Sequence, residues 1–317
     1  MEHRTSASLA FVFPGQGSQS VGMLQDFAKQ EDIISATYSE ASDLLGYDLW
    51  NVVQKGPEIE LNKTEITQPA LLTAGVAIWR LWCKYNGAIP EYMAGHSLGE
   101  YTALVCAGAI KFEEAITLVR DRGIYMQSAV SVGDGAMAAV IGIERDKIEN
   151  VCILAGDAGI VSAANFNSPV QTVIAGQKEA VNRAMELAKE AGAKRVLLLP
   201  ISVPSHCSLM KPAAEQLSIR LDEINITDAS IAVIQNVDAC PHVFVDEIKL
   251  ALVKQLHQPV LWVDTIQRLS ELNCRAIIES GPGKILSGLI KRIRKDIDIV
   301  NLEYIDSFRS ALNYNVT

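Results

Sequence analysis

The sequence predicts an α/β fold with a parallel sheet that is interrupted by a smaller α+β unit. Two observations predict the parallel sheet: short apolar segments alternate with helical patterns, and tight glycine turns follow two of these segments. A third observation predicts the interruption, because the middle of the chain has its patterns in the order β-α-β-β-α-β. The length of 317 residues allows about two domains at roughly 150 residues each.

The first part of the chain alternates short strands with helices. Residues 8–13 (SLAFVF) are predicted to form a buried strand that ends in a glycine-rich turn. A second short strand is expected at residues 92–94, where Gly95 ends it. Helical patterns are found at 35–45, at 70–82 after Gln68-Pro69, and at 101–109. Strand, turn and helix in this order form the repeating unit of a parallel sheet.

The middle of the chain has the split βαβ order of a ferredoxin-like module. Strands are predicted at 136–142, 160–163, 172–175 and 196–199, and helices at 145–154 and 178–191. We therefore expect a small ferredoxin-like subdomain at residues 131–199. The larger α/β domain is then formed by 1–130 and 200–317, and the segment from about 200 to 305 must complete its sheet.

Composition and charge exclude several classes of protein. Hydrophobic residues make up 49% of the chain and charged residues 21%, which is typical of a globular protein. The net charge of −9 argues against nucleic acid as a partner, and no apolar run approaches the ~18 residues that span a membrane. Six cysteines without a C-x-x-C pair predict neither disulfides nor a zinc site. We therefore expect an enzyme of the reducing cytoplasm without a metal.

The segment Gly95-His96-Ser97-Leu98-Gly99 fits the G-x-S-x-G pattern of a nucleophile elbow and lies between a predicted strand and a predicted helix. Glycines are needed because a Cβ at either flank would collide with the neighbouring strand or helix. The turn would expose the Oγ of Ser97 and direct the N–H of Leu98 toward a developing oxyanion. A chance loop is the alternative interpretation.

A serine nucleophile needs a base, and the chain has five histidines. Elimination favours His206, which follows the strand-like run 196–201, because the ends of strands commonly carry catalytic groups. Two alternatives stay open at this point. A single histidine is often structural, and the adjacent Cys207 could act as a thiol nucleophile.

Two arginines lie on the helix that is predicted to begin near Glu113. Arg122 shares a face with apolar residues of this helix, whereas Arg120 points almost oppositely. An arginine on an apolar face needs an anionic partner, because an unpaired buried charge is costly. A buried ion pair with a protein carboxylate is one interpretation.

Six motifs in this order resemble those of the malonyl-CoA:acyl carrier protein transacylases, the stand-alone acyltransferases of type II fatty acid synthesis. The motifs are FPGQGSQ (13–19), GHSLGE (95–100), Arg122-Gly123, NFNSP (165–169), PSHC (204–207) and GPG (281–283). The resemblance covers residues 8–305. It implies a hydrolase-like α/β domain with an inserted ferredoxin-like subdomain, in agreement with the pattern of elements.

The resemblance also implies how the site works. Ser97 would attack the malonyl thioester, with His206 as its general base, and the backbone N–H groups of Gln16 and Leu98 would form the oxyanion hole. Arg122 would hold the free carboxylate of the substrate in bidentate fashion.

No triad carboxylate is implied, because the backbone carbonyl of Gln255 would orient the histidine. If only that carbonyl acts, the Gln255→Ala variant is expected to retain most activity. The remaining cleft contacts would be Gln68, His96, Asn165 and Asn167.

The implied substrates are malonyl-CoA and an acyl carrier protein. No nucleotide or redox cofactor is expected, because neither G-x-G segment has the third glycine of G-x-G-x-x-G. The stretch 284–295 contains five basic residues and no acidic one, and it forms either a dock for acidic partners or a solvated helix face. Its basic residues are Lys284, Lys291, Arg292, Arg294 and Lys295. A trans-acting acyltransferase of polyketide synthesis and a plain serine hydrolase are the alternative functions.

Overall fold

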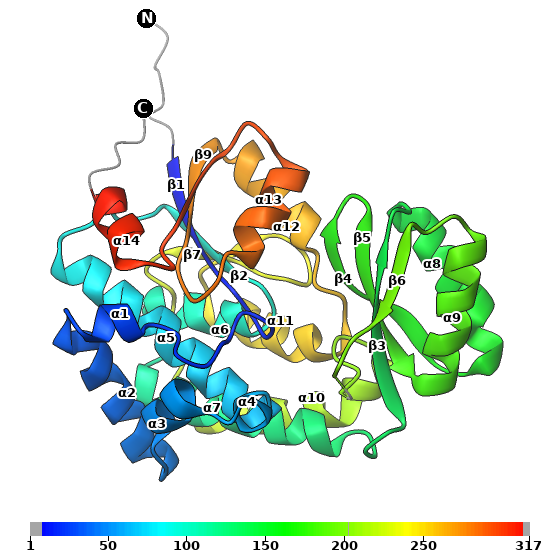
Figure 1. Cartoon of the computed structure of the whole chain (residues 1–317), viewed down its shortest axis with the longest axis horizontal. Helices are drawn as coiled ribbons and strands as arrows, with labels where there is room; N and C mark the ends of the chain where they lie inside the picture. Colours follow the sequence, from blue (N-terminus) through cyan, green and yellow to red (C-terminus); the bar gives the residue numbers. More distant parts are fainter. Residues whose placement is uncertain (1–7, 202, 313–317) are drawn as a thin grey trace, which may run out of the picture.

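The computed structural model describes residues 8–201 and 203–312, which form two sheets with helices around them (Figure 1). The larger sheet has six strands in the order β10-β9-β1-β2-β7-β8. These strands are β1 (Ser8–Phe13), β2 (Tyr92–Gly95), β7 (Ala232–Ile234), β8 (Pro241–His242), β9 (Cys274–Glu279) and β10 (Asp298–Asn301).

The larger sheet is parallel apart from one edge. β1 pairs in parallel with β2 and β9, β9 with β10, and β2 with β7, whereas β8 runs antiparallel at the edge. All six residues of β1 are buried, as is typical of a parallel strand covered on both faces. The predicted α/β fold with a parallel sheet is confirmed, and the segment after residue 200 does complete this sheet.

Helices cover both sheets. In chain order they are α1 (Gln25–Ala28), α2 (Asp32–Leu45), α3 (Leu49–Lys55), α4 (Glu58–Leu61), α5 (Thr64–Lys84), α6 (Leu98–Cys106), α7 (Phe112–Ser128), α8 (Arg145–Leu154), α9 (Lys178–Glu190), α10 (Lys211–Glu223), α11 (Val245–His257), α12 (Trp262–Glu271), α13 (Ile285–Ile293) and α14 (Ile305–Leu312).

Helix α5 corrects one predicted boundary. It begins at Thr64, six residues before the predicted start at 70, and contains Pro69. A proline near the start of a helix removes a single hydrogen bond, which the chain tolerates here because Thr67 and Gln68 bury their side chains in the same turn. The predicted strand 160–163 is also too short, since β4 continues through bulges to Ser168.

The second sheet has four strands in the order β4-β5-β3-β6, and all neighbours run antiparallel. Its strands are β3 (Gly135–Ile141), β4 (Val161–Ser168), β5 (Gln171–Gln177) and β6 (Arg195–Leu198). Helices α8 and α9 cover the face that points away from the larger sheet (Figure 1). All these elements lie within 131–199, while the domain boundaries themselves stay a prediction whose outer ends, 1–7 and 313–317, lie outside the described residues.

Backbone hydrogen bonds join strand β4 of the small sheet to the segment between α11 and α12. The N–H of Phe166 in β4 donates to the carbonyl of Val260 at 3.0 Å, and the N–H of Val260 donates to the carbonyl of Ala164 at 2.8 Å. The second face of the small sheet, which includes Met137 and Val173, lies across a cavity from the residues that follow β1 and β2. None of the helices in the described ranges is long and apolar enough to cross a membrane.

Candidate active site

Ser97 occupies a strained turn between β2 and α6. Its φ of 52° and ψ of −108° are unusual for a residue other than glycine. The turn is tight because the neighbouring elements touch: a Cβ on Gly95 would lie 1.8 Å from the carbonyl carbon of Gly99, and one on Gly99 would lie 2.0 Å from the carbonyl oxygen of Phe13. The crowding predicted for the two glycines is thus observed, and it pushes the side chain of Ser97 outward.

Ser97 and His206 form a hydrogen-bonded pair. The Oγ of Ser97 lies 2.8 Å from the Nε2 of His206, whose Nδ1 lies 2.6 Å from the backbone carbonyl oxygen of Gln255. Because a carbonyl oxygen only accepts, Nδ1 must carry the proton and donate it to Gln255. The Nε2 of a neutral His206 is therefore left as an acceptor for the Ser97 hydroxyl, the arrangement a general base requires.

The surroundings of His206 keep it neutral. Burial, the charge of Arg122 and the neighbouring His96 lower its pKa, the Gln255 carbonyl raises it, and the net result is a pKa of about 3. Cys207 offers no competing nucleophile, since burial raises its pKa to about 11 and its thiol donates to the carbonyl of Pro204. The unprotonated Nε2 of His206 therefore faces the hydroxyl of Ser97 and no other nucleophile among the described residues.

Arg122 enters the site from α7 and is buried, with 1% of its surface exposed. Its guanidinium donates to the Oε1 of Gln68 at 2.7 Å, the Oε1 of Gln255 at 2.9 Å and the Oγ of Ser97 at 3.3 Å. Arg120 instead pairs with the adjacent Asp121 at 2.8 Å. The helix face predicted for Arg122 is the one that the structure buries.

The hydrogen-bond partners of Arg122 are all neutral. Within the described ranges no carboxylate forms an ion pair with it, so a salt bridge inside the protein does not explain its burial. The Nε of Arg122 is also buried, and it has no hydrogen-bond acceptor among the described residues. Burial lowers the pKa of Arg122 but leaves a guanidinium that is always charged in proteins. A buried cation with a spare N–H is suited to an incoming anion.

A cavity of about 450 Å³ opens onto Ser97, His206 and Arg122. It is also lined by the other predicted contacts Gln16, Leu98, His96, Asn165 and Asn167. Gln68 is not in this lining, but it binds Arg122, and the Nε2 of His96 lies 2.8 Å from the Oδ1 of Asn167. Leu98 is the first residue of α6, so its N–H has no partner inside the helix. All the predicted site residues are thus in or beside one cavity.

Sequence reasoning missed three contributions to the site. The side chain of Gln255 donates from Nε2 to the carbonyl of Ser97 at 3.0 Å, in addition to binding Arg122. Asn236 accepts the N–H of Ser97 at 2.7 Å, and Glu100 accepts the N–H of Asn236 at 2.6 Å. A signal for Asn236 was present, because it is the second of two polar residues that follow the apolar strand β7.

The basic stretch 284–295 begins at the start of α13 and reaches the rim of the cavity. Lys284, Lys291, Arg292 and Lys295 are exposed. Arg292 donates to the side chain of Gln171, which lines the cavity. Arg294 is engaged by Asp296 at 2.6 Å, so it is less available to a partner than the other four.

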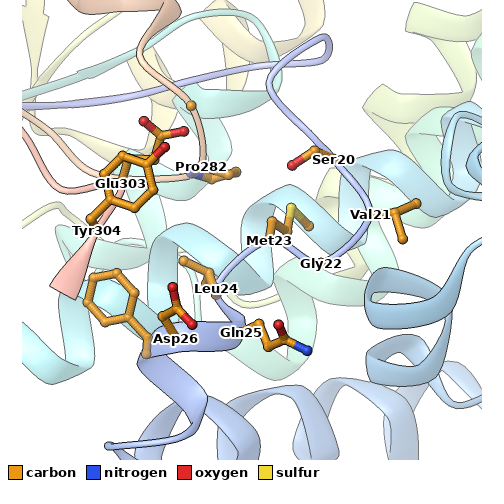
Figure 2. Close-up of a pocket in the computed structure, with 12 residues that line it drawn as sticks. Ser20, Val21, Gly22, Met23, Leu24, Gln25, Asp26, Pro282, Glu303 and Tyr304 are labelled. Atoms are coloured by element: carbon orange, nitrogen blue, oxygen red, sulfur yellow. The ribbon is translucent and has the colours of Figure 1, made fainter.

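A second hollow, of about 220 Å³, lies between residues 20–27 and the segments around Pro282 and Tyr304 (Figure 2). Its described lining contains serine, glutamine and carboxylate side chains but no histidine, cysteine or arginine. It therefore lacks a nucleophile with a base, and the chemistry points to the Ser97 cavity. No cluster of metal ligands is found in the described ranges.

Comparison with known proteins gives one family. Residues 10–303 match the acyl transferase domain family. The chain is 53% identical to the malonyl CoA-acyl carrier protein transacylase of Haemophilus influenzae over 308 residues, which cover 97% of this chain and 99% of the relative. It is 42% identical to the protein of the same name from Bacillus subtilis, with 93% of each chain covered.

Solved structures agree with the sequence matches. An acyl carrier protein S-malonyltransferase from Vibrio cholerae superposes with a TM-score of 0.94 at 52% identity, covering 96% of this chain and 99% of the other. A malonyl-transacylase in complex with a type II polyketide acyl-carrier protein superposes with a TM-score of 0.96 at 50% identity, covering 98% of this chain and 100% of the other.

The side chain of Gln255 gives a first prediction, which replaces the expectation that Gln255→Ala retains most activity. The variant keeps the carbonyl that orients His206 but loses the bonds to Ser97 and Arg122. Losing one or two buried hydrogen bonds, one of them to a charged group, should reduce kcat/KM by ~10- to 100-fold. His206→Ala, measured alongside, should lose more. Wild-type kinetics in Gln255→Ala would show that only the carbonyl matters.

The low pKa of His206 gives a second prediction. At pH 4.5 only about 1% of a histidine with the usual pKa of about 6.5 is neutral, so the reaction of Ser97 would slow roughly 100-fold. A histidine with a pKa of about 3 stays neutral at this pH. Inactivation of Ser97 by a fluorophosphonate should therefore fall less than about 3-fold between pH 7.5 and 4.5. Arg122→Gln removes the nearby charge and should move the decline to higher pH, unlike Arg120→Gln.

Protein stability should change with pH in the same range. The unfolded chain binds a proton on this histidine below about pH 6.5 and the folded chain does not, so His206 makes the protein less stable as the pH falls from about 6.5 toward 3. Folding is checked by circular dichroism at each pH. If the rate at which the fluorophosphonate inactivates the wild-type protein falls with a midpoint near pH 6.5, the low pKa of His206 is contradicted.

Proposed function

Because the chain belongs to the family of malonyl CoA-acyl carrier protein transacylases, we propose that it transfers a malonyl group from malonyl-CoA to the phosphopantetheine thiol of an acyl carrier protein. This is the malonyl-loading step of fatty acid synthesis. The observation that carries the proposal is the buried Arg122, which lies 3.3 Å from the Oγ of Ser97 without a carboxylate partner in the described part of the chain.

Transfer begins with acylation of the enzyme. The Oγ of Ser97 attacks the thioester carbonyl carbon while the Nε2 of His206 takes the hydroxyl proton. The negative charge that develops on the carbonyl oxygen is stabilised by the N–H groups of Gln16 and Leu98. The tetrahedral intermediate then expels the thiolate of coenzyme A, and His206 gives its proton to that thiolate. The product on the enzyme is the ester malonyl-Ser97.

The second half reverses these steps with a different thiol. The carrier's phosphopantetheine thiol gives its proton to His206 and attacks the ester carbonyl of malonyl-Ser97. Collapse of the intermediate breaks the bond to Oγ, and His206 returns the proton to Ser97. Nucleophile and base are supplied by the chain itself, so the reaction proposed here uses no cofactor.

Arg122 provides the preference for malonyl over unsubstituted acyl groups. The substrate carboxylate would replace some of its neutral partners and use both prongs of the guanidinium. Gln68 and Gln255 hold the guanidinium in place from two sides. A plain serine hydrolase would have no use for a buried, unpaired arginine, and the relatives are transacylases.

The carrier would dock on the basic stretch 284–295 through Lys284, Lys291, Arg292 and Lys295, with Arg294 less available. Charge complementarity accelerates the encounter of such partners. Arg292 supports this site because it binds Gln171 at the rim of the cavity.

A second candidate function, loading of a polyketide carrier, is favoured by the similar malonyl-transacylase that is bound to a type II polyketide carrier. We place the enzyme in the cytoplasm, with neither nucleic acid nor membrane as a partner.

The covalent intermediate gives a third prediction. Incubation with malonyl-CoA in the absence of carrier should add one malonyl group to Ser97, detected by peptide mass spectrometry, and initial rates should follow ping-pong kinetics. Adding fatty acid and polyketide carrier proteins in parallel should discharge the label and identify the preferred carrier. A label on Cys207, or no label in an active preparation, would rule the intermediate out.

The carboxylate clamp gives a fourth prediction. Arg122→Ala should reduce kcat/KM for malonyl-CoA by ~10²-fold or more, since a lost charged hydrogen bond costs about 1.5–3 kcal/mol and the clamp makes two. Transfer from acetyl-CoA should change little, because acetyl has no carboxylate. Arg122→Lys should recover only part of the activity.

Arg120→Ala is the matched control for this test, since Arg120 lies on the same helix but pairs with Asp121. It should keep the preference for malonyl-CoA. The clamp assignment is wrong if Arg120→Ala loses the preference while Arg122→Ala keeps it. An equal fall with both substrates in Arg122→Ala would assign Arg122 a structural role.

A further inference from the structure

Asn236 binds the backbone of the turn that carries Ser97, and it does not line the cavity. Its Nδ2 donates to the carbonyl of Gly95 at 2.6 Å, and its Oδ1 accepts the N–H of Ser97 at 2.7 Å. One planar amide thus spans the residues on either side of His96. The pairing of β2 with β7 ends at Ala94 and Ile234, so the side chain of Asn236 continues this ladder where the backbone pairing stops.

Asn236 is itself fixed through its backbone. Its N–H donates to the Oε2 of Glu100 at 2.6 Å, and its carbonyl accepts the N–H of Leu261 at 2.8 Å. Glu100 comes from the first turn of α6, the helix that follows the elbow. Both Asn236 and Glu100 are completely buried, and neither lines the cavity.

Such bonds matter because the backbone of Ser97 is strained. A residue other than glycine keeps a positive φ, such as the 52° of Ser97, only where its surroundings hold it there. At Ser97 the N–H is held by Asn236, and the carbonyl is held by the side chain of Gln255. Without Asn236 the N–H of Ser97 would be buried without an acceptor, and the turn could relax.

We propose that Asn236 is a positioning residue that holds the Oγ of Ser97 in line with His206, and that Glu100 holds Asn236 in place. This role rests on the proposed function of Ser97 as nucleophile. Glu100 acts here through its Oε2, which accepts the N–H of Asn236. Burial raises its pKa to about 8. A glutamine keeps an oxygen that can accept the N–H of Asn236, so it should replace Glu100 in this role.

The test uses a fluorophosphonate, which reacts with Ser97 through the dyad but needs neither the Arg122 clamp nor a carrier. Its second-order labelling rate is measured for Asn236→Ala, Asn236→Asp, Glu100→Ala and Glu100→Gln, with the labelled residue identified by mass spectrometry. Gln235→Ala is the matched control, because Gln235 is equally buried beside Asn236 and its side chain binds only the carbonyl of Val233 among the described residues. Thermal unfolding is recorded for every variant, and rates are measured below the lowest midpoint.

Asn236→Ala should lower the labelling rate by ~30-fold or more, and should lower kcat for malonyl transfer with KM changed less than about 2-fold. Asn236→Asp keeps the acceptor for Ser97 but loses the donor to Gly95, so its labelling rate should fall ~10-fold. If Asn236→Ala does not fold, the labelling rate of Asn236→Asp tests the proposal in its place. The labelling rate of Glu100→Ala should fall ~10-fold. The rates of Glu100→Gln and Gln235→Ala should stay within about 3-fold of the wild-type rate.

Labelling at the wild-type rate in Asn236→Ala, or an equal fall in Gln235→Ala, would overturn the proposal and leave Asn236 as a packing residue. A fall in Glu100→Gln as large as in Glu100→Ala would overturn the part assigned to Glu100. A separate result tests the proposed function. If the wild-type protein is labelled at Ser97 but does not transfer malonyl, malonyl transfer is refuted, while the labelling rates of the variants still test the positioning role of Asn236.

Discussion

The close approach of β1, β2 and α6 is the constraint on which the site depends. Gly95 and Gly99 have no room for a Cβ, so the strand and the helix meet with only Ser97 projecting between them. This contact imposes the positive φ of Ser97 and exposes its hydroxyl. It also brings the start of α6, where the N–H of Leu98 has no partner inside the helix, beside Ser97. The proposed nucleophile and one proposed oxyanion donor thus come from a single packing contact.

A strained turn needs support, and neighbouring elements supply it. Asn236 at the end of β7 holds the amide of Ser97, while Gln255 on α11 holds its carbonyl and orients His206. Three parallel strands therefore contribute at their carboxyl ends: β1 leads to Gln16, β2 to Ser97 and β7 to Asn236. This is the edge at which open α/β sheets usually carry their sites.

Electrostatics separates this site from a simple hydrolase site. Arg122 is buried among amide oxygens and a hydroxyl, and its charge helps to keep His206 neutral. When an anionic substrate compensates that charge, the base should become stronger, because the positive neighbour that lowers its pKa is offset. Binding of the carboxylate and activation of the dyad would then be coupled through one guanidinium.

Local patterns predicted much of the fold, including the buried first strand, the elbow and the β-α-β-β-α-β order, because each depends on residues that are close in the sequence. They predicted the start of α5 poorly, since Pro69 is a strong local signal for a boundary while the burial of Thr67 and Gln68 comes from packing. They also placed Arg122 on the buried face of its helix, because helical periodicity is local.

The sequence by itself determined the residue types of the site: the nucleophile between its glycines, a histidine that could serve as base, and an arginine on an apolar face. Only the tertiary structure decided which groups meet. Ser97 lies 109 residues from His206 and 139 residues from Asn236, and the side chain of Gln255 reaches Arg122 across 133 residues. No local pattern encodes such distances, because they follow from the order of strands in the sheet and from helices packing across it.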